Sequence, residues 1–356
     1  MYVAYTAPHW PLHAREEDIA KYKGRFDEGW DKLREERLER MVRMGIINPS
    51  WKLTPRDPSQ PEWKNAENKE WLLRCMEVYA AQIDRMDQGI GRILDTLEKT
   101  NQLENTVIIF LSDNGACEED IPQNVTGEEL EKLFIAKRYT RQGEEVKFGN
   151  YPEIMPGPEN TYQSYGTAWA NLSDTPFRYY KHWVHEGGIA TPFIVQWPEG
   201  IKDKGALRHT PGQLTDVMAT ILDITGAKYP AQYKGRDILP LEGQSLVPVF
   251  AGDTGKHAPL YWEHEGNAAV RIGKWKLVRE YPKAWELYNM EKDRTELNNL
   301  AEAYPEKVRE MSEKYENWAK RCRVIPREKI LELMKQKESE LAFWDKENLK
   351  KSHATT

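Results

Sequence analysis

The stretch Thr106-Val-Ile-Ile-Phe-Leu-Ser112, followed at once by Asp113-Asn114-Gly115, decides how this sequence is interpreted. An unbroken run of β-branched and apolar residues is typical of a strand buried on both faces, and α/β proteins place their chemistry at the carboxyl ends of such strands. Asp113 and Asn114 would then offer two oxygen ligands to a hard cation. Because Ca²⁺ or Mg²⁺ takes six or more ligands, other groups must complete the shell. The alternative is a plain turn that closes the strand.

Two further segments carry residues with chemistry of their own. His9 lies in Pro8-His-Trp-Pro11, where the prolines exclude a regular helix and hold the backbone around the imidazole. Lys181 begins Lys181-His-Trp-Val-His-Glu-Gly-Gly188, a segment that leads through a glycine turn into the strand-like run 193–197. A histidine held in this way suits proton transfer near neutral pH. Each segment taken singly also fits a structural role.

Together and in this order, the three segments resemble the sulfatase family. In sulfatases a Ser-Asp-Asn-Gly strand end supplies two ligands of a catalytic divalent metal, a Pro-His-x-Pro loop a substrate-binding histidine, and a Lys-x4-Glu-Gly-Gly segment a lysine for the sulfate group. The resemblance therefore implies that Asp113 and Asn114 bind Ca²⁺ or Mg²⁺. It also implies catalytic and substrate-binding roles for His9 and Lys181. An arginine common in the family after Gly-Gly-Ile is Ala190 here.

The resemblance continues into the C-terminal third. Residues 259–267, 273–277 and 285–288 look like the C-terminal subdomain of bacterial arylsulfatases. Within the first of these segments, His264 is a further candidate for substrate binding.

One family feature is missing. The sulfatase nucleophile is a formylglycine made from the Cys or Ser of a Cys/Ser-x-Pro-x-Arg motif, and the three cysteines of this sequence stand in other contexts, at Cys75, Cys117 and Cys322. The N-terminal Asp pair of the metal site is also absent. The segment 1–5 has the pattern of the end of a buried strand, so we expect a chain that lacks an N-terminal part. A gene-model artefact, a split gene and a genuine loss all stay open.

Length and apolar pattern predict an α/β fold in two parts. Residues 1–250 are expected to form a mostly parallel central sheet flanked by helices, which the resemblance makes alkaline-phosphatase-like. Residues 251–356 are expected to form a small antiparallel sheet with helices and a charged helical tail. Apolar spacing predicts a long helix over 71–97 and a shorter one that ends near Gly226. The polar segment 116–180 is expected to form the rim of the substrate site.

Charge and composition narrow the partners. The formal net charge of −6, with acidic and basic residues interspersed, gives no broad positive field, so a nucleic acid is not expected. No apolar run reaches the roughly 18 residues of a membrane span. Three cysteines cannot form a disulfide framework. Oligomeric state and localisation stay open, and a periplasmic or extracellular location fits if a signal peptide precedes Met1.

Three functions remain in competition. The first is an arylsulfatase-type hydrolase of sulfate esters, present here as a fragment that lacks the nucleophile and is inactive alone, with a sulfated small molecule or glycan as substrate. The second is a non-catalytic sulfatase-like protein that binds sulfated glycans or a partner subunit. The third is a relative that acts on phosphate or phosphonate esters, which the His9 and Lys181 segments disfavour. Which sulfate ester is used does not follow from the sequence.

Overall fold

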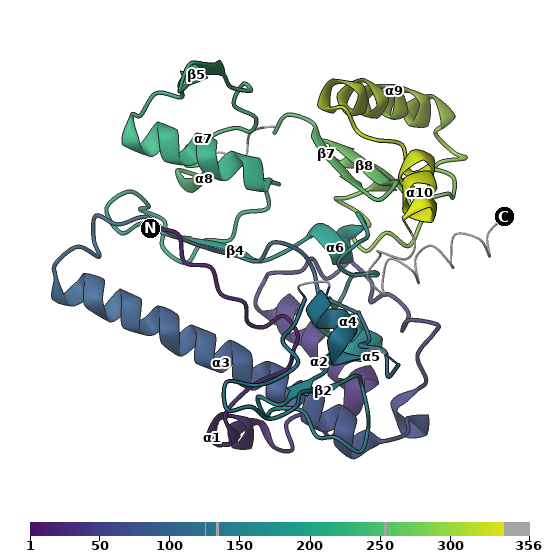
Figure 1. Ribbon diagram of the computed structural model, residues 1–356. Helices are drawn as coiled ribbons and strands as arrows, with labels where there is room; N and C mark the ends of the chain where they lie inside the picture. Colours follow the sequence, from purple (N-terminus) through teal and green to yellow (C-terminus); the bar gives the residue numbers. More distant parts are fainter. Residues whose placement is uncertain (125, 133–134, 253–254, 256, 338–356) are drawn as a thin grey trace.

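The computed structural model describes residues 1–124, 126–132, 135–252, 255 and 257–337. The chain is mixed α/β, and Figure 1 shows a long helix in the lower part, with the C-terminal strands and helices gathered at the upper right. None of the described helices combines the length and the apolar character that crossing a membrane requires. Shorter elements connect the main ones: α1 (Glu16–Ile19), η1 (Ala20–Tyr22), η2 (Trp63–Asn65), α4 (Gly127–Lys132), β2 (Lys147–Phe148), β3 (Thr161–Tyr162), α6 (Glu186–Ile189), β5 (Gln232–Tyr233), β6 (Arg236–Asp237) and α8 (Val247–Phe250).

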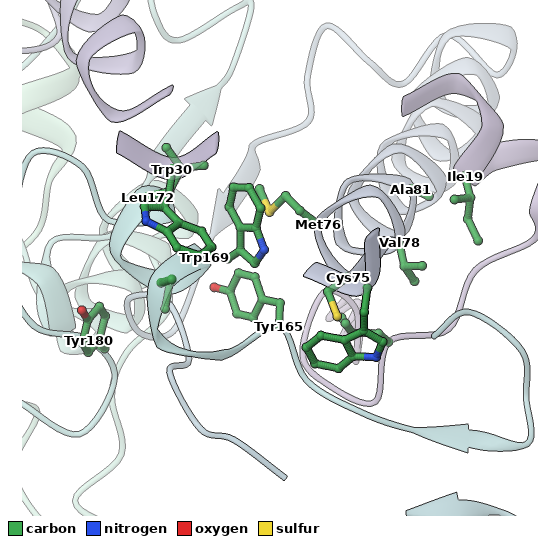
Figure 2. Packing of buried hydrophobic residues seen from close by; sticks show 14 residues of the cluster. Ile19, Trp30, Cys75, Met76, Val78, Ala81, Tyr165, Trp169, Leu172 and Tyr180 are labelled. Carbon is green, nitrogen blue, oxygen red and sulfur yellow. The ribbon is translucent and has the colours of Figure 1, made fainter. Parts of the chain in front are cut away.

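The main core forms around the long helix α3 (Lys69–Lys99), which confirms the helix expected over 71–97. Its apolar residues recur three or four positions apart, so one face is apolar and packs inward. That face meets α5 (Gly166–Ser173), where the indole of Trp169 is fully buried and donates a hydrogen bond of 2.9 Å to the Leu72 carbonyl. Figure 2 shows Trp169 between Trp30 and Tyr165. Helix α2 (Gly29–Arg43) supplies Trp30 to this cluster.

The expectation that 116–180 is only a rim is wrong for its last third. Helix α5 lies in the core, because Gly166-Thr-Ala-Trp-Ala-Asn-Leu172 is dominated by small and large apolar side chains. The surrounding Gly, Pro and polar residues hid this short apolar segment in the sequence. Helix α5 is thus joined to α3 within one apolar cluster.

Strand β1 (Ile108–Leu111) confirms the decisive stretch as a strand, but its neighbour runs the other way. It pairs with β4 (Phe193–Gln196) in antiparallel register, with Ile108 opposite Gln196, whereas the short strands β2 and β3 pair in parallel. The strands are also not buried on both faces, since Ile194 is 60% exposed. An apolar run predicts that a strand forms. It does not determine the direction of the neighbouring strand or which parts of the chain cover the two faces of the sheet.

The C-terminal part confirms the expected small antiparallel sheet with a helix. Four strands pair in the order β10-β9-β8-β7, and α9 packs against β8 and β9 to bury an apolar cluster. Helix α7 ends at Gly226 in a left-handed conformation, as the sequence predicted. Of the expected charged tail, α10 is described and residues 338–356 lie outside the described part. The elements are α7 (Leu214–Thr225), β7 (Leu260–His264), β8 (Asn267–Ile272), β9 (Trp275–Arg279), β10 (Glu286–Asn289), α9 (Pro305–Cys322) and α10 (Arg327–Gln336).

Candidate active site

Glycine contacts bring two of the sequence motifs together. The Gly115 amide donates a hydrogen bond of 2.9 Å to the Gly188 carbonyl, and the Lys181 amide donates one of 2.9 Å to the Ala116 carbonyl. A Cβ atom added at Gly115 would lie 1.7 Å from the Gly187 carbonyl oxygen, so no larger residue fits there without a shift. The strand end after β1 and the lysine segment therefore run side by side.

A buried charge network fixes the turn of the lysine segment. The Glu186 carboxylate pairs with Lys276 at 2.9 Å and with Arg294 at 2.7 Å, and the Glu186 amide donates to Glu296 at 3.0 Å. Burial alone would raise the pKa of Glu186, but Lys276 and Arg294 outweigh it and lower this pKa to about 2. The turn that follows Lys181 is thereby attached to the C-terminal sheet.

His9 and Lys181 meet although 172 residues separate them. The Lys181 Nζ atom lies 3.3 Å from His9 Nε2. On the other side of the ring, His9 Nδ1 lies 2.9 Å from the Trp10 carbonyl oxygen, which can only accept. Nδ1 therefore carries the proton and donates, which leaves Nε2 as an acceptor for the lysine ammonium. The resemblance predicts that His9, Lys181, Asp113 and Asn114 converge on one cleft, and the structure brings His9 and Lys181 of these four into contact.

Glu119 also belongs to this group and was missed from the sequence. Its Oε2 atom lies 3.4 Å from Lys181 Nζ and accepts a hydrogen bond of 3.0 Å from the Trp10 indole. Burial would raise the pKa of Glu119, but the Cys117 thiol, Lys181 and Trp10 stabilise the anion and lower it. The one sequence feature that could have indicated Glu119 is its position, six residues after the candidate metal ligand Asp113.

Cys117 is the second missed residue. Its thiol lies 3.0 Å from Glu119 Oε2 and 4.0 Å from Lys181 Nζ. Burial, and after it the Glu119 charge, raises the pKa of Cys117 to about 12. The thiol is therefore protonated at neutral pH and donates to Glu119, so it lacks the thiolate that a nucleophile needs.

Asp113 and Asn114 follow strand β1 as expected. They are not part of the cluster of His9, Lys181, Glu119 and Cys117. Within the described residues, no hydrogen bond or ion pair joins either side chain to His9 or Lys181. The Asp113 carboxylate is exposed, and Asn114 Nδ2 donates a hydrogen bond of 2.8 Å to the Gly115 carbonyl. This contact uses the Asn114 amide nitrogen and not its Oδ1. One carboxylate and one amide oxygen fit a hard cation, as two ligands of a larger shell.

His264 is placed next to the neighbour of Lys181. It is exposed at the end of β7, and its ring centroid lies 4.9 Å from that of His182. Burial lowers the pKa of His182, although Glu265 acts in the opposite direction. His182 follows Lys181, which pairs with Glu119, so the two groups of residues are joined through the lysine segment. In the described structure His264 contacts His182 and not Lys181.

Comparison with known proteins identifies the class. The family described as Sulfatase matches residues 1–227, and the family described as N-sulphoglucosamine sulphohydrolase, C-terminal, matches residues 177–321. The chain belongs to the sulfatase family.

Individual relatives agree with this assignment. The chain is 34% identical over 323 residues to an uncharacterized sulfatase of Schizosaccharomyces pombe, covering 88% of this chain and 56% of that protein. It is 31% identical over 251 residues to an arylsulfatase of Klebsiella aerogenes, covering 70% and 50%. The crystal structure of Ps i-CgsB in complex with k-i-k-neocarrahexaose matches with a TM-score of 0.54 and 22% identity, over 89% of this chain and 49% of that one. The chain thus spans about half the length of these relatives, with the alkaline-phosphatase-like fold that sulfatases share.

Proposed function

We propose that this chain carries one part of the active site of an arylsulfatase-type hydrolase of sulfate esters. The observation that supports the proposal is the contact of 3.3 Å between His9 Nε2 and Lys181 Nζ. Two groups so distant in sequence converge where a small anion would need a cation and a proton-transferring ring together.

The roles follow from the charges and atoms. Lys181 offsets the negative charge on the sulfate oxygens. His9, with its Nδ1 proton held on the Trp10 carbonyl, directs Nε2 toward the leaving oxygen. In its imidazolium form it would donate the Nε2 proton to that oxygen as a nucleophile from outside these residues bonds to sulfur and the S–O bond breaks, which leaves the imidazole neutral. His264 is the proposed contact to the remainder of the ester, reached from the C-terminal sheet.

Glu119 stands where the substrate anion is expected. Its carboxylate already lies between Lys181 and the Trp10 indole. A sulfate group that binds Lys181 therefore has to share it with Glu119 or displace that carboxylate, because two anions repel each other at this distance.

Asp113 and Asn114 are the proposed metal ligands, with Ca²⁺ or Mg²⁺ as the cation. When bound, the metal would polarise the sulfate oxygens. The sequence of 356 residues contains no Cys/Ser-x-Pro-x-Arg motif, so it holds no residue that becomes the formylglycine nucleophile. We therefore expect these residues alone to have no sulfatase turnover.

Purified protein with an aryl sulfate and Ca²⁺ tests this expectation. Release of the aryl alcohol should not exceed that of a Lys181→Ala variant. Metal-dependent turnover clearly above that variant would show that a nucleophile acts here that the motif search does not find.

The missing motif, together with the preserved His9 and Lys181 pair, also favours a second function. A chain that binds sulfate without cleaving it would act as a receptor for sulfated glycans or as a partner subunit. Calorimetric titration with a sulfated oligosaccharide and its desulfated counterpart measures this binding. We expect affinity only for the sulfated form, weakened by Lys181→Ala and unchanged by Lys204→Ala, an exposed lysine on the surface. Equal binding of both oligosaccharides would argue against either function.

A further inference from the structure

A second group of metal-ligating side chains lies outside the proposed calcium or magnesium site. His182 comes from the lysine segment, whereas His264 and Glu265 come from the end of β7. One ligand atom from each of the three lies within 4.8 Å of the others. In particular, His182 Nδ1 is 3.8 Å from Glu265 Oε2. One ion placed among these atoms could be reached by all three with small side-chain rotations.

Glu265 offers a buried carboxylate oxygen next to His182. Its Oε2 atom is buried and accepts no hydrogen bond in the described structure. The Arg327 guanidinium lies 2.9 Å from this atom as an ion-pair partner, but without hydrogen-bond geometry. The ion pair with Arg327 compensates part of the charge on Oε2, and this oxygen can still accept a further cation or a water.

The backbone holds the two loops in place for this arrangement. His182 and Glu265 both have positive φ angles, +93° and +52°, which residues other than glycine rarely adopt. The Asn267 side chain donates a hydrogen bond of 3.2 Å to the His182 carbonyl and so joins the loops directly. The rings of His182 and His264 stand nearly perpendicular, at 87°. The three ligands are thus positioned before any ion arrives.

We propose that His182, His264 and Glu265 form a binding site for a borderline transition-metal cation, with Zn²⁺ as its representative. Two imidazole nitrogens and one carboxylate oxygen are the ligands that Zn²⁺ takes, whereas Ca²⁺ and Mg²⁺ require oxygen ligands. His264 is exposed, so water or another ligand can occupy the fourth position. Arg327 pairs with the same Glu265 oxygen that faces His182, so the ion would share Oε2 with Arg327 or bind the other carboxylate oxygen.

A competing group, His9, Cys117 and Glu119, is equally close in space. There the Lys181 ammonium lies 3.3 Å from His9 and 3.4 Å from Glu119, so it opposes a cation at two of the three ligands. In the His182 group, Arg327 is an ion-pair partner of one ligand, Glu265. The Cys117 thiol would also have to lose a proton that its surroundings retain. The histidine pair therefore binds the metal first.

The site has consequences for the neighbouring chemistry but does not depend on it. An ion shared by His182 and the end of β7 would join the lysine segment to the C-terminal sheet at a second point. It would also take His264 away from a substrate, so Zn²⁺ and the ester would compete for this side chain. Metal binding itself can be measured whether or not the protein cleaves sulfate esters.

The test is calorimetric titration of the chelator-treated full chain with Zn²⁺, followed by visible absorption with Co²⁺. We expect one equivalent of Zn²⁺ to bind and Co²⁺ to give the bands of a tetrahedral site. His264→Ala should raise the Kd at least about tenfold. His209→Ala, at an exposed histidine elsewhere, and Cys117→Ser should leave it unchanged.

Because His264 is exposed, its substitution is expected to leave the fold intact, which circular dichroism checks. Glu265→Gln gives an independent variant, and it should also weaken Zn²⁺ binding. An unchanged Kd in both variants would overturn the proposal. A loss of binding in Cys117→Ser alone would equally overturn it, since the ion would then sit in the other group.

Discussion

Replacing Lys276 by methionine tests the buried network that holds the lysine segment. Lys276 is fully buried, with its Nζ atom 2.9 Å from Glu186 and 2.8 Å from Glu296. In the variant Glu186 keeps Arg294 at 2.7 Å, but Glu296 loses its cation. Removing one partner of a buried ion pair costs about 3–5 kcal/mol, because a charge is left without compensation. We expect the free energy of unfolding to fall by this amount.

Urea denaturation followed by tryptophan fluorescence measures the change. Lys292→Met, which removes an exposed lysine close by in sequence, should change stability by no more than about 0.5 kcal/mol. Adding Glu296→Gln to Lys276→Met should recover part of the loss, because it removes the uncompensated charge. A loss below about 1 kcal/mol, or no recovery in the double variant, would refute the view that the network is held by charge.

Two further outcomes are expected. The pKa of Glu186 lies at about 2 in the folded chain, below its ordinary value of 4.5, so its contribution of about 3 kcal/mol is complete above pH 4.5 and is lost as pH falls toward 2. Urea midpoints at pH 7, 4.5 and 3 should show this decline in the wild-type chain and a smaller decline in Glu186→Gln. The same decline with pH in both proteins would contradict the prediction. Glu119→Gln removes the carboxylate beside Lys181, so a sulfated ligand should bind up to about fivefold more tightly at low salt. Titration measures this change, and weaker binding would show that Glu119 assists the anion.

Sequence patterns predicted those elements whose cause is local. Helix α3 follows from apolar side chains recurring along one face, and the end of α7 follows from Gly226. The contact of His9 with Lys181 was also expected, although its basis was different. No periodicity joins residues that far apart, and only the resemblance to a family with a shared anion site predicted that they meet.

Features that depend on tertiary packing were not predictable in this way. The antiparallel pairing of β1 with β4 does not follow from the sequence, because the apolar run of each strand is compatible with either direction. Cys117 and Glu119 carry no motif by themselves. They join the site because the loop after Gly115 packs tightly against the glycine turn of the lysine segment. The close contact is shown by the 1.7 Å that would separate a Cβ atom at Gly115 from the Gly187 carbonyl oxygen, and the sequence alone does not reveal it.

In the proposed sulfate site, the ion pair of Glu119 with Lys181 would affect which anions bind. Without a ligand, the Lys181 ammonium already pairs with the Glu119 carboxylate at 3.4 Å. A sulfate ester that binds Lys181 therefore replaces an existing ion pair and does not meet an unpaired cation. A free sulfate ion that contacts only Lys181 cannot displace the Glu119 carboxylate, which is part of the chain and also accepts the Trp10 indole hydrogen bond. A ligand that brings further contacts, such as one to His9 or to a bound metal, can displace it. Selectivity for an ester over free sulfate would then come from the contacts around Lys181 rather than from the lysine charge itself.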